Sequence, residues 1–188
     1  MPAATPPVRC SPSTAAFPPD SHVTSLLVIC TGNAARSVMA GAALAAREPS
    51  LTIVTAGTFS VDGQPISWRT REALQRVDLS ARNHRSQQIT PEHVAAADLV
   101  LAMAPEHVAW IRREYPQAAH RTATLKRLVR DLPTDGPITE RLDGLALHTV
   151  ALEPWEEIID PGGGEVDDFI ACAHEVVALI DQIVDRLR

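Results

Sequence analysis

Short apolar runs alternate with helix-like segments along most of the chain. The apolar runs that lack polar alternation lie at residues 26–30 (LLVIC), 51–57 (LTIVTAG) and 97–103 (ADLVLAM). The helix-like segments that follow them lie at residues 36–48, 65–77 and 105–115. Uninterrupted runs of Val, Ile and Leu are typical of parallel strands that are covered on both faces. The pattern therefore predicts an α/β domain of three layers, with helices on both faces of a parallel sheet.

The second half of the chain gives weaker signals. Residues 121–125 are consistent with a fourth strand. Residues 166–187 carry apolar side chains at helical spacing, which predicts a long C-terminal helix. Proline and glycine punctuate residues 131–155, so we expect a surface excursion there.

The first 24 residues differ in composition from the rest of the chain. They are rich in proline, serine and alanine and show no hydrophobic period, so they cannot bury enough apolar surface to offset the entropy of ordering. We therefore predict a disordered tail at residues 1–24, with Cys10 as an exposed thiol. A single domain is predicted at residues 25–188.

Composition and charge argue against several classes of function. The formal net charge is -6, with acidic and basic residues mixed along the chain, whereas a nucleic-acid partner needs a basic face. No apolar run approaches the length of about 20 residues that spans a bilayer, so we expect no membrane partner and a cytoplasmic protein. The three cysteines and seven histidines show no ligand spacing, so we expect neither a metal nor another cofactor.

The turn between the first apolar run and the first helix has the features of an anion site. Cys30 ends the run, and Arg36 and Ser37 open the helix after five intervening residues. A strand-to-helix turn of this kind directs backbone N–H groups and the positive end of the helix dipole at one point. Gly32 permits the positive φ that a tight loop needs, and Asn33 tolerates the left-handed region as well.

Cys30 and Arg36 give this turn its chemistry. The guanidinium presents a fork of donors that matches the geometry of phosphate, and the cation, the N–H groups and the dipole together favour the thiolate of Cys30. A thiolate beneath a bound phosphate is a nucleophile. The GxxxxGK[ST] and GxGxxG motifs of nucleotide-binding loops are absent. A core cysteine beside a surface arginine is the competing interpretation.

A phosphate ester also needs a proton for its leaving oxygen, and the segment EEIIDPGGGEVDDF supplies a candidate donor. Asp160 is followed by Pro161 and three glycines, which predicts a turn that holds the carboxyl in place. The competing interpretation is an ordinary Asp-Pro turn ahead of a helix whose first acidic residues favour the helix dipole.

Together these segments resemble the low-molecular-weight protein tyrosine phosphatase family. The motifs VICTGNAARS, TAGT, VDLSARNHRSQQIT, ADLVLAM and DPGGG follow one another in that order. The resemblance implies a four-stranded parallel sheet in the order 2-1-3-4, with helices on both faces. It also implies that Cys30 is the nucleophile, that Arg36 binds phosphate, and that Asp160 is the general acid that later activates water.

The resemblance also implies which residues support the site. Its phosphate-binding loop consists of Thr31, Gly32, Asn33, Ala34, Ala35, Arg36 and Ser37. Ser37 is similar to the hydroxyl that stabilises the thiolate, and Asn33 to the asparagine that braces the loop. Thr55 and His84 stand in the places of the partners of that asparagine. For His84, an ordinary core or surface histidine is the alternative.

The sequence departs from the family pattern at several positions. Ala35 replaces a second cysteine, so Cys30 has no local disulfide partner against over-oxidation. Val38 replaces a proline in the first turn of the helix. Gly162 replaces the aromatic residue after Asp-Pro, and Phe59 stands where a tryptophan or tyrosine is expected after TAGT. An aryl substrate would therefore find few walls.

We expect a phosphomonoester hydrolase that acts through a phosphocysteine on a phosphorylated protein or small molecule. The DPxGG form resembles bacterial members that include phosphoarginine phosphatases, so phosphoarginine and small molecules are alternative substrates. Arsenate reduction is a second alternative, but the segment ARNHRSQQIT holds no cysteine to carry electrons. A phosphate-binding regulatory module without turnover is a third. The sequence does not determine the oligomeric state.

Overall fold

The computed structural model describes residues 23–187 and contains a central four-stranded parallel sheet. The strands are β1 (Ser25–Cys30), β2 (Thr52–Gly57), β3 (Leu99–Ala102) and β4 (Thr122–Thr124), in the spatial order β2-β1-β3-β4. Each neighbouring pair is parallel. The fold class and the strand order that the sequence indicates are confirmed, including the weak fourth strand.

β1 is a central strand whose two faces contact two different cores. Leu26, Val28 and Cys30 belong to one core, and Leu27 and Ile29 belong to the other. None of these five residues is more than 3% exposed. Burial on both faces explains why this run shows no polar alternation.

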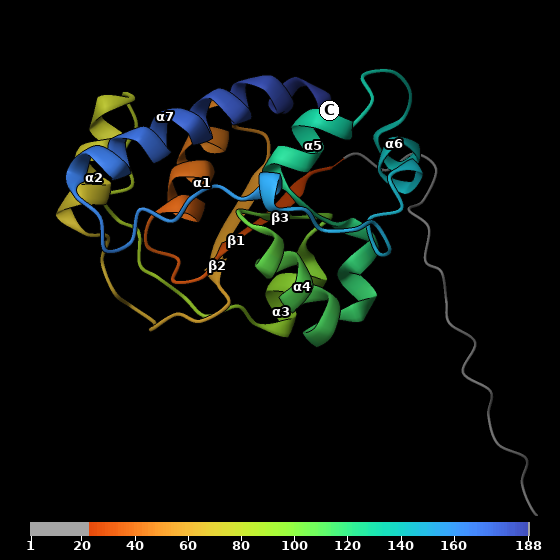
Figure 1. Ribbon diagram of the computed structural model, residues 1–188, viewed down its shortest axis with the longest axis horizontal. Coiled ribbons are helices and arrows are strands. Elements are labelled where there is room, and N and C mark those ends of the chain that lie inside the picture. Colours follow the sequence, from red (N-terminus) through yellow and green to blue (C-terminus); the bar gives the residue numbers. More distant parts are fainter. Residues whose placement is uncertain (1–22, 188) are drawn as a thin grey trace, which may run out of the picture.

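Helices cover both faces of the sheet (Figure 1). α1, α2, α5 and α7 contribute to the core on one face, and α3 and α4 to the core on the other. The helices are α1 (Arg36–Arg47), α2 (Trp68–Arg76), α3 (Pro91–Ala96), α4 (Pro105–Glu114), α5 (Leu125–Asp131), α6 (Ile138–Gly144) and α7 (Val166–Ile183). Short 3-10 helices lie at Pro116–Arg121, Pro154–Glu156 and Val184–Leu187.

The four long helices follow the predicted periodicity, whereas the short ones do not. α3 and α5 have 6 and 7 residues, which is at most two turns and too little to display a period of 3.6. Each begins at a threonine, Thr90 or Thr124, whose side chain accepts a hydrogen bond from a backbone N–H of the first turn. Among the helices of residues 23–187, none is long and apolar enough to cross a membrane.

Residues 131–155 lie largely at the surface, as predicted, but they also contribute to the core. They contain α6, and several of their side chains are 3% exposed or less and belong to the core. These side chains are Leu132, Ile138, Leu142 and Leu147. The sequence analysis did not predict these core contacts because proline and glycine mark chain reversals without showing whether the apolar residues between them reach the core.

A buried ion pair fixes the end of this segment. Glu156 is fully buried and accepts hydrogen bonds from Arg127 Nη2 (2.5 Å) and from Thr124 Oγ1 (2.7 Å). Thr124 ends β4, so the carboxylate ties the chain to the sheet four residues before Asp160. A buried carboxylate requires partners of this kind because desolvation of an unpaired charge is costly.

The N-terminal end of the described chain lies against the sheet. Val23 is 6% exposed and joins the core on the α1 side, and the Thr24 N–H donates to Asp98 Oδ2 at 2.9 Å. The predicted tail, with Cys10, falls almost wholly outside the described residues, so the division at residues 24 and 25 stays a prediction.

Candidate active site

Cys30 lies at the carboxyl end of β1, with β2 on one side and β3 on the other. A ligand crevice forms at such a switch point of a parallel sheet. Cys30 is 3% exposed, and its Sγ lies 3.0 Å from Ser37 Oγ in the first turn of α1. A hydroxyl that donates to the sulfur stabilises a thiolate, because hydrogen bonds to an ionised acceptor are the stronger ones.

The loop between Cys30 and α1 turns its carbonyl oxygens outward. The donors that hold them are Thr58 N on Cys30 O (2.9 Å), Phe59 N on Thr31 O (2.9 Å), Ser60 Oγ on Gly32 O (3.1 Å), His84 Nε2 on Asn33 O (2.9 Å) and Thr70 Oγ1 on Ala34 O (3.0 Å). In a trans peptide the C=O and the following N–H point in opposite directions, and residues 23–187 contain no cis peptide. The loop N–H groups therefore face inward and form a cradle for an anion.

The N-terminus of α1 adds to this cradle. Its N-cap residue, Ala35, provides no side chain that accepts a hydrogen bond from the first turn. The first N–H groups of a helix have no partner within the helix, and the positive end of the dipole favours an anion beside them. The absence of a side-chain cap leaves these donors to a ligand.

Asn33, and not Gly32, takes the left-handed conformation in this loop. The φ of Asn33 is 50°, whereas Gly32 is not among the residues with positive φ. The sequence left both residues open, and the asparagine side chain holds the backbone in that conformation. Its Nδ2 donates to Ser37 Oγ and Thr55 Oγ1, both at 3.0 Å, and its Oδ1 accepts from Gln87 N at 3.0 Å.

The structure brings the predicted supporting residues together around Asn33. Thr55 and Ser37 bind its side chain, and His84 binds its carbonyl oxygen. Burial lowers the pKa of His84, the hydrogen bond to Asn33 opposes this shift, and the Arg85 cation adds to it. A neutral His84 with its proton on Nε2 therefore fits the donor role on the Asn33 carbonyl.

Gly57 allows β2 to approach the loop closely. It pairs with Cys30 in the sheet register. A Cβ atom at this position would lie 2.5 Å from the Thr31 carbonyl oxygen and 2.7 Å from Ser60 Cβ. The glycine of the TAGT segment is thus required by the close approach of the loop backbone.

Arg36 is buried and reaches across to the Asp160-Pro161 turn. Its side chain is 2% exposed, so the surface-arginine interpretation is wrong. Nη1 donates to Ile158 O at 3.2 Å, and Nη2 donates to Thr31 Oγ1 at 3.3 Å and to Asp160 Oδ2 at 2.5 Å. The fold therefore places Asp160 at the Cys30 loop, although 124 residues separate it from Arg36.

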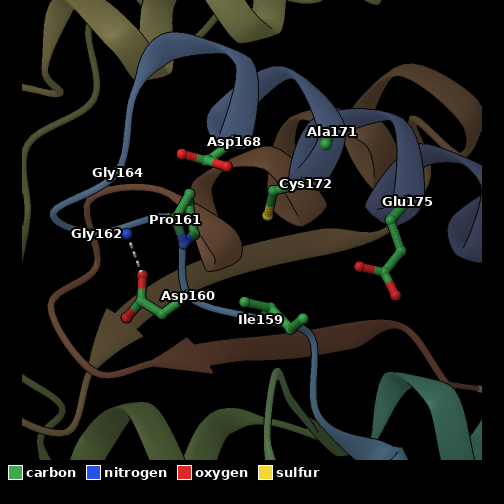
Figure 2. Close-up of a pocket in the computed structure, with 9 residues that line it drawn as sticks. All are labelled: Ile159, Asp160, Pro161, Gly162, Gly164, Asp168, Ala171, Cys172 and Glu175. Carbon is green, nitrogen blue, oxygen red and sulfur yellow. Dashed lines mark hydrogen bonds between the residues drawn. The ribbon is translucent and has the colours of Figure 1, made fainter.

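Both oxygens of the Asp160 carboxylate have partners. Oδ2 accepts from Arg36, and Oδ1 accepts from the backbone N–H of Gly162 at 2.9 Å (Figure 2). Just ahead of the carboxylate, Ile158 N donates to Met103 O at 2.9 Å, beyond the end of β3. The Asp160 side chain remains 48% exposed, so it is held in place and still open to a substrate and to water.

A cavity of about 380 Å³ lies between the Asp160 turn and α7. Its lining residues, drawn in Figure 2, are Ile159, Asp160, Pro161, Gly162, Gly164, Asp168, Ala171, Cys172 and Glu175. Three of them carry carboxylates and none carries a basic group. Two of these carboxylates are paired with cations, Asp160 with Arg36 and Glu175 with Lys126 Nζ at 2.7 Å. The cavity adjoins the candidate general acid.

Cys172 lies in this cavity, but its thiol is unsuited to electron transfer. Burial raises its pKa to about 12, with the Arg36 cation opposing the shift. A thiol that stays protonated is a poor nucleophile for disulfide exchange. This observation argues against arsenate reduction, which needs a second reactive thiol.

Two departures from the family pattern lie at the rim of the site. Phe59 donates its N–H to Thr31 O, and its side chain is 84% exposed. Gly162 leaves the Asp160 turn without a side chain beside the carboxylate, where a Cβ would lie 3.1 Å from Asp160 Oδ1. The mouth of the site is consequently open on the Asp160 side.

His107 is a residue of this site that the sequence analysis missed. It lies in the first turn of α4, its side chain is 2% exposed, and its Nε2 lies 3.0 Å from Thr31 Oγ1. Burial lowers its pKa to about 3; the Arg36 cation adds to the shift and Asp160 opposes it. The available signal was its place just after β3, because the carboxyl ends of neighbouring parallel strands meet at one edge of the sheet.

The lowered pKa of His107 predicts a pH-dependent stability. An unfolded chain holds this histidine at its ordinary pKa of 6.5, and the folded chain at about 3, so between these values only the unfolded state binds the proton. The free energy of unfolding is expected to fall as the pH drops below 6.5, by about 1.4 kcal/mol per pH unit from this residue. Urea unfolding of the wild type and of His107→Gln between about pH 5 and 7 measures it. Equal pH slopes for the two proteins would contradict the assignment.

Known proteins share this arrangement of sheet and loop. A family model described as "Low molecular weight phosphotyrosine protein phosphatase" matches residues 25–140. The chain belongs to this family. Low molecular weight phosphatases are cysteine-dependent hydrolases, so the protein is a phosphatase, and the family indicated by its motifs is confirmed.

Relatives of this low molecular weight phosphatase match most of its length. A protein-arginine-phosphatase of Geobacillus stearothermophilus is 32% identical over 164 residues, which cover 87% of this chain and 95% of the relative. The solved structure of an arginine phosphatase from the same species has a TM-score of 0.71 at 32% identity, covering 87% of this chain and 92% of that one. A solved low molecular weight protein tyrosine phosphatase from T. tengcongensis has a TM-score of 0.70 at 28% identity, covering 86% of this chain and 98% of that one.

Proposed function

We propose that Cys30, Arg36 and Asp160 form the catalytic site of this phosphatase. The observation that carries the proposal is the position of the Arg36 guanidinium. It is buried at the Cys30 loop and donates both to the Thr31 hydroxyl and to the Asp160 carboxylate. A phosphate-binding cation, a thiol and a partly exposed carboxyl group thereby share one crevice.

In the first step, the Cys30 thiolate attacks phosphorus and the bond to the leaving group breaks. The loop N–H groups and Arg36 bind the equatorial oxygens, where negative charge develops. Asp160 gives its proton to the leaving atom, so the product does not leave as the strongly basic unprotonated species. Ser37 donates to Cys30 Sγ and stabilises the thiolate before attack.

In the second step, water attacks the phosphorus of the phosphocysteine. Asp160, now ionised, takes a proton from this water, and the thiolate of Cys30 leaves. Inorganic phosphate is released and each residue returns to its starting state. Splitting one difficult displacement into two easier ones is the advantage of the covalent intermediate.

For the substrate, we propose phosphoarginine on proteins. The 32% identical relative that spans nearly the whole chain is named a protein-arginine-phosphatase. Cleavage of phosphoarginine with a proton from Asp160 yields a guanidinium cation. The cavity beside Asp160 also carries the carboxylate of Asp168 and that of Glu175, which is paired with Lys126 Nζ at 2.7 Å. A tyrosine leaving group carries no positive charge that these carboxylates could stabilise, and Gly162 provides no aromatic ring that could stack on the tyrosine.

A comparison of three substrates tests both parts of this proposal. The wild-type protein, with a chelator present, is incubated with p-nitrophenyl phosphate and with two peptides of the same flanking sequence, one carrying phosphoarginine and one phosphotyrosine. We expect phosphate release from all three, with kcat/KM at least about 10-fold higher for the phosphoarginine peptide. A faster phosphotyrosine peptide would overturn the substrate and leave the mechanism standing. No release from any substrate would overturn the mechanism and favour a phosphate-binding module.

We also propose that the protein acts in the cytoplasm. Within the described residues, Cys30 and Cys172 are both free thiols, and a thiolate nucleophile needs a reducing compartment to stay unoxidised. A cytoplasmic phosphorylated protein is accordingly the partner that this site requires.

A further inference from the structure

The site contains a buried histidine with one unpartnered nitrogen. His107 Nδ1 has no hydrogen-bond partner among residues 23–187, although the side chain is only 2% exposed. Its Nε2 lies 3.0 Å from Thr31 Oγ1 and 3.5 Å from Glu106 Oε1. Most buried polar atoms in proteins have a partner, so an orphan beside a catalytic loop needs an explanation.

We infer the direction of each hydrogen bond from the contacts around Thr31. Arg36 Nη2 is always a donor, so the Thr31 hydroxyl oxygen accepts from it. The hydroxyl proton is then free to point to an acceptor, and His107 Nε2 at 3.0 Å is closer than Glu106 Oε1 at 3.5 Å. We infer that the imidazole accepts at Nε2 and so carries its proton on Nδ1, the atom that has no partner among the described residues.

We propose that His107 is a positioning residue for Arg36 and acts through the Thr31 hydroxyl. By accepting the hydroxyl proton, it keeps the oxygen lone pairs of Thr31 turned toward Arg36 Nη2. The guanidinium is thereby held at the mouth of the loop before phosphate arrives, so less ordering is needed on binding. This inference rests on the proposed role of Arg36 in binding phosphate.

The unpartnered Nδ1 atom distinguishes a positioning role of His107 from a simple packing role. A leucine at position 107 would fill a similar space and would remove a buried donor that lacks a partner, so the fold gains nothing from histidine there. Residues that lower stability in this way are found where a function requires them. Stability and phosphate binding should therefore respond in opposite directions to the loss of His107.

Two substitutions at this position test the proposal. His107→Leu removes the acceptor, and His107→Gln keeps an acceptor near the place of Nε2. The dissociation constant of inorganic phosphate is measured by calorimetry, which needs no turnover, beside KM and kcat for p-nitrophenyl phosphate and the midpoint of thermal unfolding. His148→Leu, at an exposed histidine away from the loop, is the matched control and should leave all values unchanged.

We expect His107→Leu to weaken phosphate binding and raise KM by about 10-fold, the effect of one lost hydrogen bond to a charged network, with an unfolding midpoint equal to or above that of the wild type. His107→Gln should recover most of the affinity. Unchanged phosphate binding in His107→Leu, or a loss of binding accompanied by a lower unfolding midpoint and no recovery in His107→Gln, would overturn the proposal. Phosphate binding without turnover in the wild type would instead overturn the proposed catalysis alone.

Discussion

Cys30→Ser is expected to abolish turnover while leaving phosphate binding largely intact. The serine hydroxyl is not ionised at neutral pH and has no base beside it, so the attack on phosphorus is lost. The carbonyls of the loop keep their outside donors, such as Thr58 and Phe59, so the N–H cradle remains in place. We expect kcat for p-nitrophenyl phosphate to fall by a factor on the order of 10⁴ or more. Steady-state kinetics, together with calorimetric titration of inorganic phosphate, measures the two effects separately.

A trapped intermediate provides the stronger test of Cys30. Rapid acid quenching of the wild type during turnover should yield a protein whose mass has increased by one phosphoryl group, and Cys30→Ala, which has no nucleophile at this position, should yield none. Cys10→Ser, the matched change at the cysteine of the N-terminal segment, should behave as the wild type. Wild-type turnover in Cys30→Ser would show that another group attacks phosphorus.

Asp160→Asn is expected to slow substrates with poor leaving groups far more than those with good ones. A basic leaving atom, such as the nitrogen of arginine or the oxygen of phenol, needs a proton as its bond to phosphorus breaks, whereas p-nitrophenolate leaves readily without one. We expect kcat for phosphoarginine or phenyl phosphate to fall by about 10² to 10⁴. The loss for p-nitrophenyl phosphate should be clearly smaller.

Phosphate binding distinguishes this role from a structural one. In the free protein Arg36 Nη2 is shared between Thr31 and Asp160, so the loss of the carboxylate charge should leave the affinity for inorganic phosphate equal or higher. The control is Asp181→Asn. Asp181 lies near the end of α7 and pairs with Arg47 of α1, so its loss should change the turnover of neither substrate. An equal loss for good and poor leaving groups would count against Asp160 as the acid.

The phosphate cradle could be predicted because its determinants are local in sequence. An apolar strand, a short loop with Gly and Asn, and a helix that begins with Arg36 and Ser37 already place a thiol beside inward-facing N–H groups. The detail that the sequence left open was which residue has positive φ. Both Gly32 and Asn33 tolerate that conformation, and only the contacts of the Asn33 side chain with Ser37, Thr55 and Gln87 decided between them.

Asp160 and His107 illustrate the two ways in which distant residues enter a site. Asp160 stands in a recognisable motif, so the sequence indicated a role for it but not its contact with Arg36. His107 stands in no motif and could not be singled out among seven histidines. Its burial, its distance to Thr31 and its lowered pKa exist only because β3 lies next to β1 in the sheet.

The sequence by itself determined the α/β class, the strands and long helices, and the family, because hydrophobic period and short motifs are properties of neighbouring residues. The tertiary structure alone decided that residues 131–155 reach the core, that Arg36 is buried, and that Asp160 and His107 converge on the Cys30 loop. These facts depend on contacts between residues far apart in the chain. Such contacts are set by how strands pair and helices pack, and no local pattern records that arrangement.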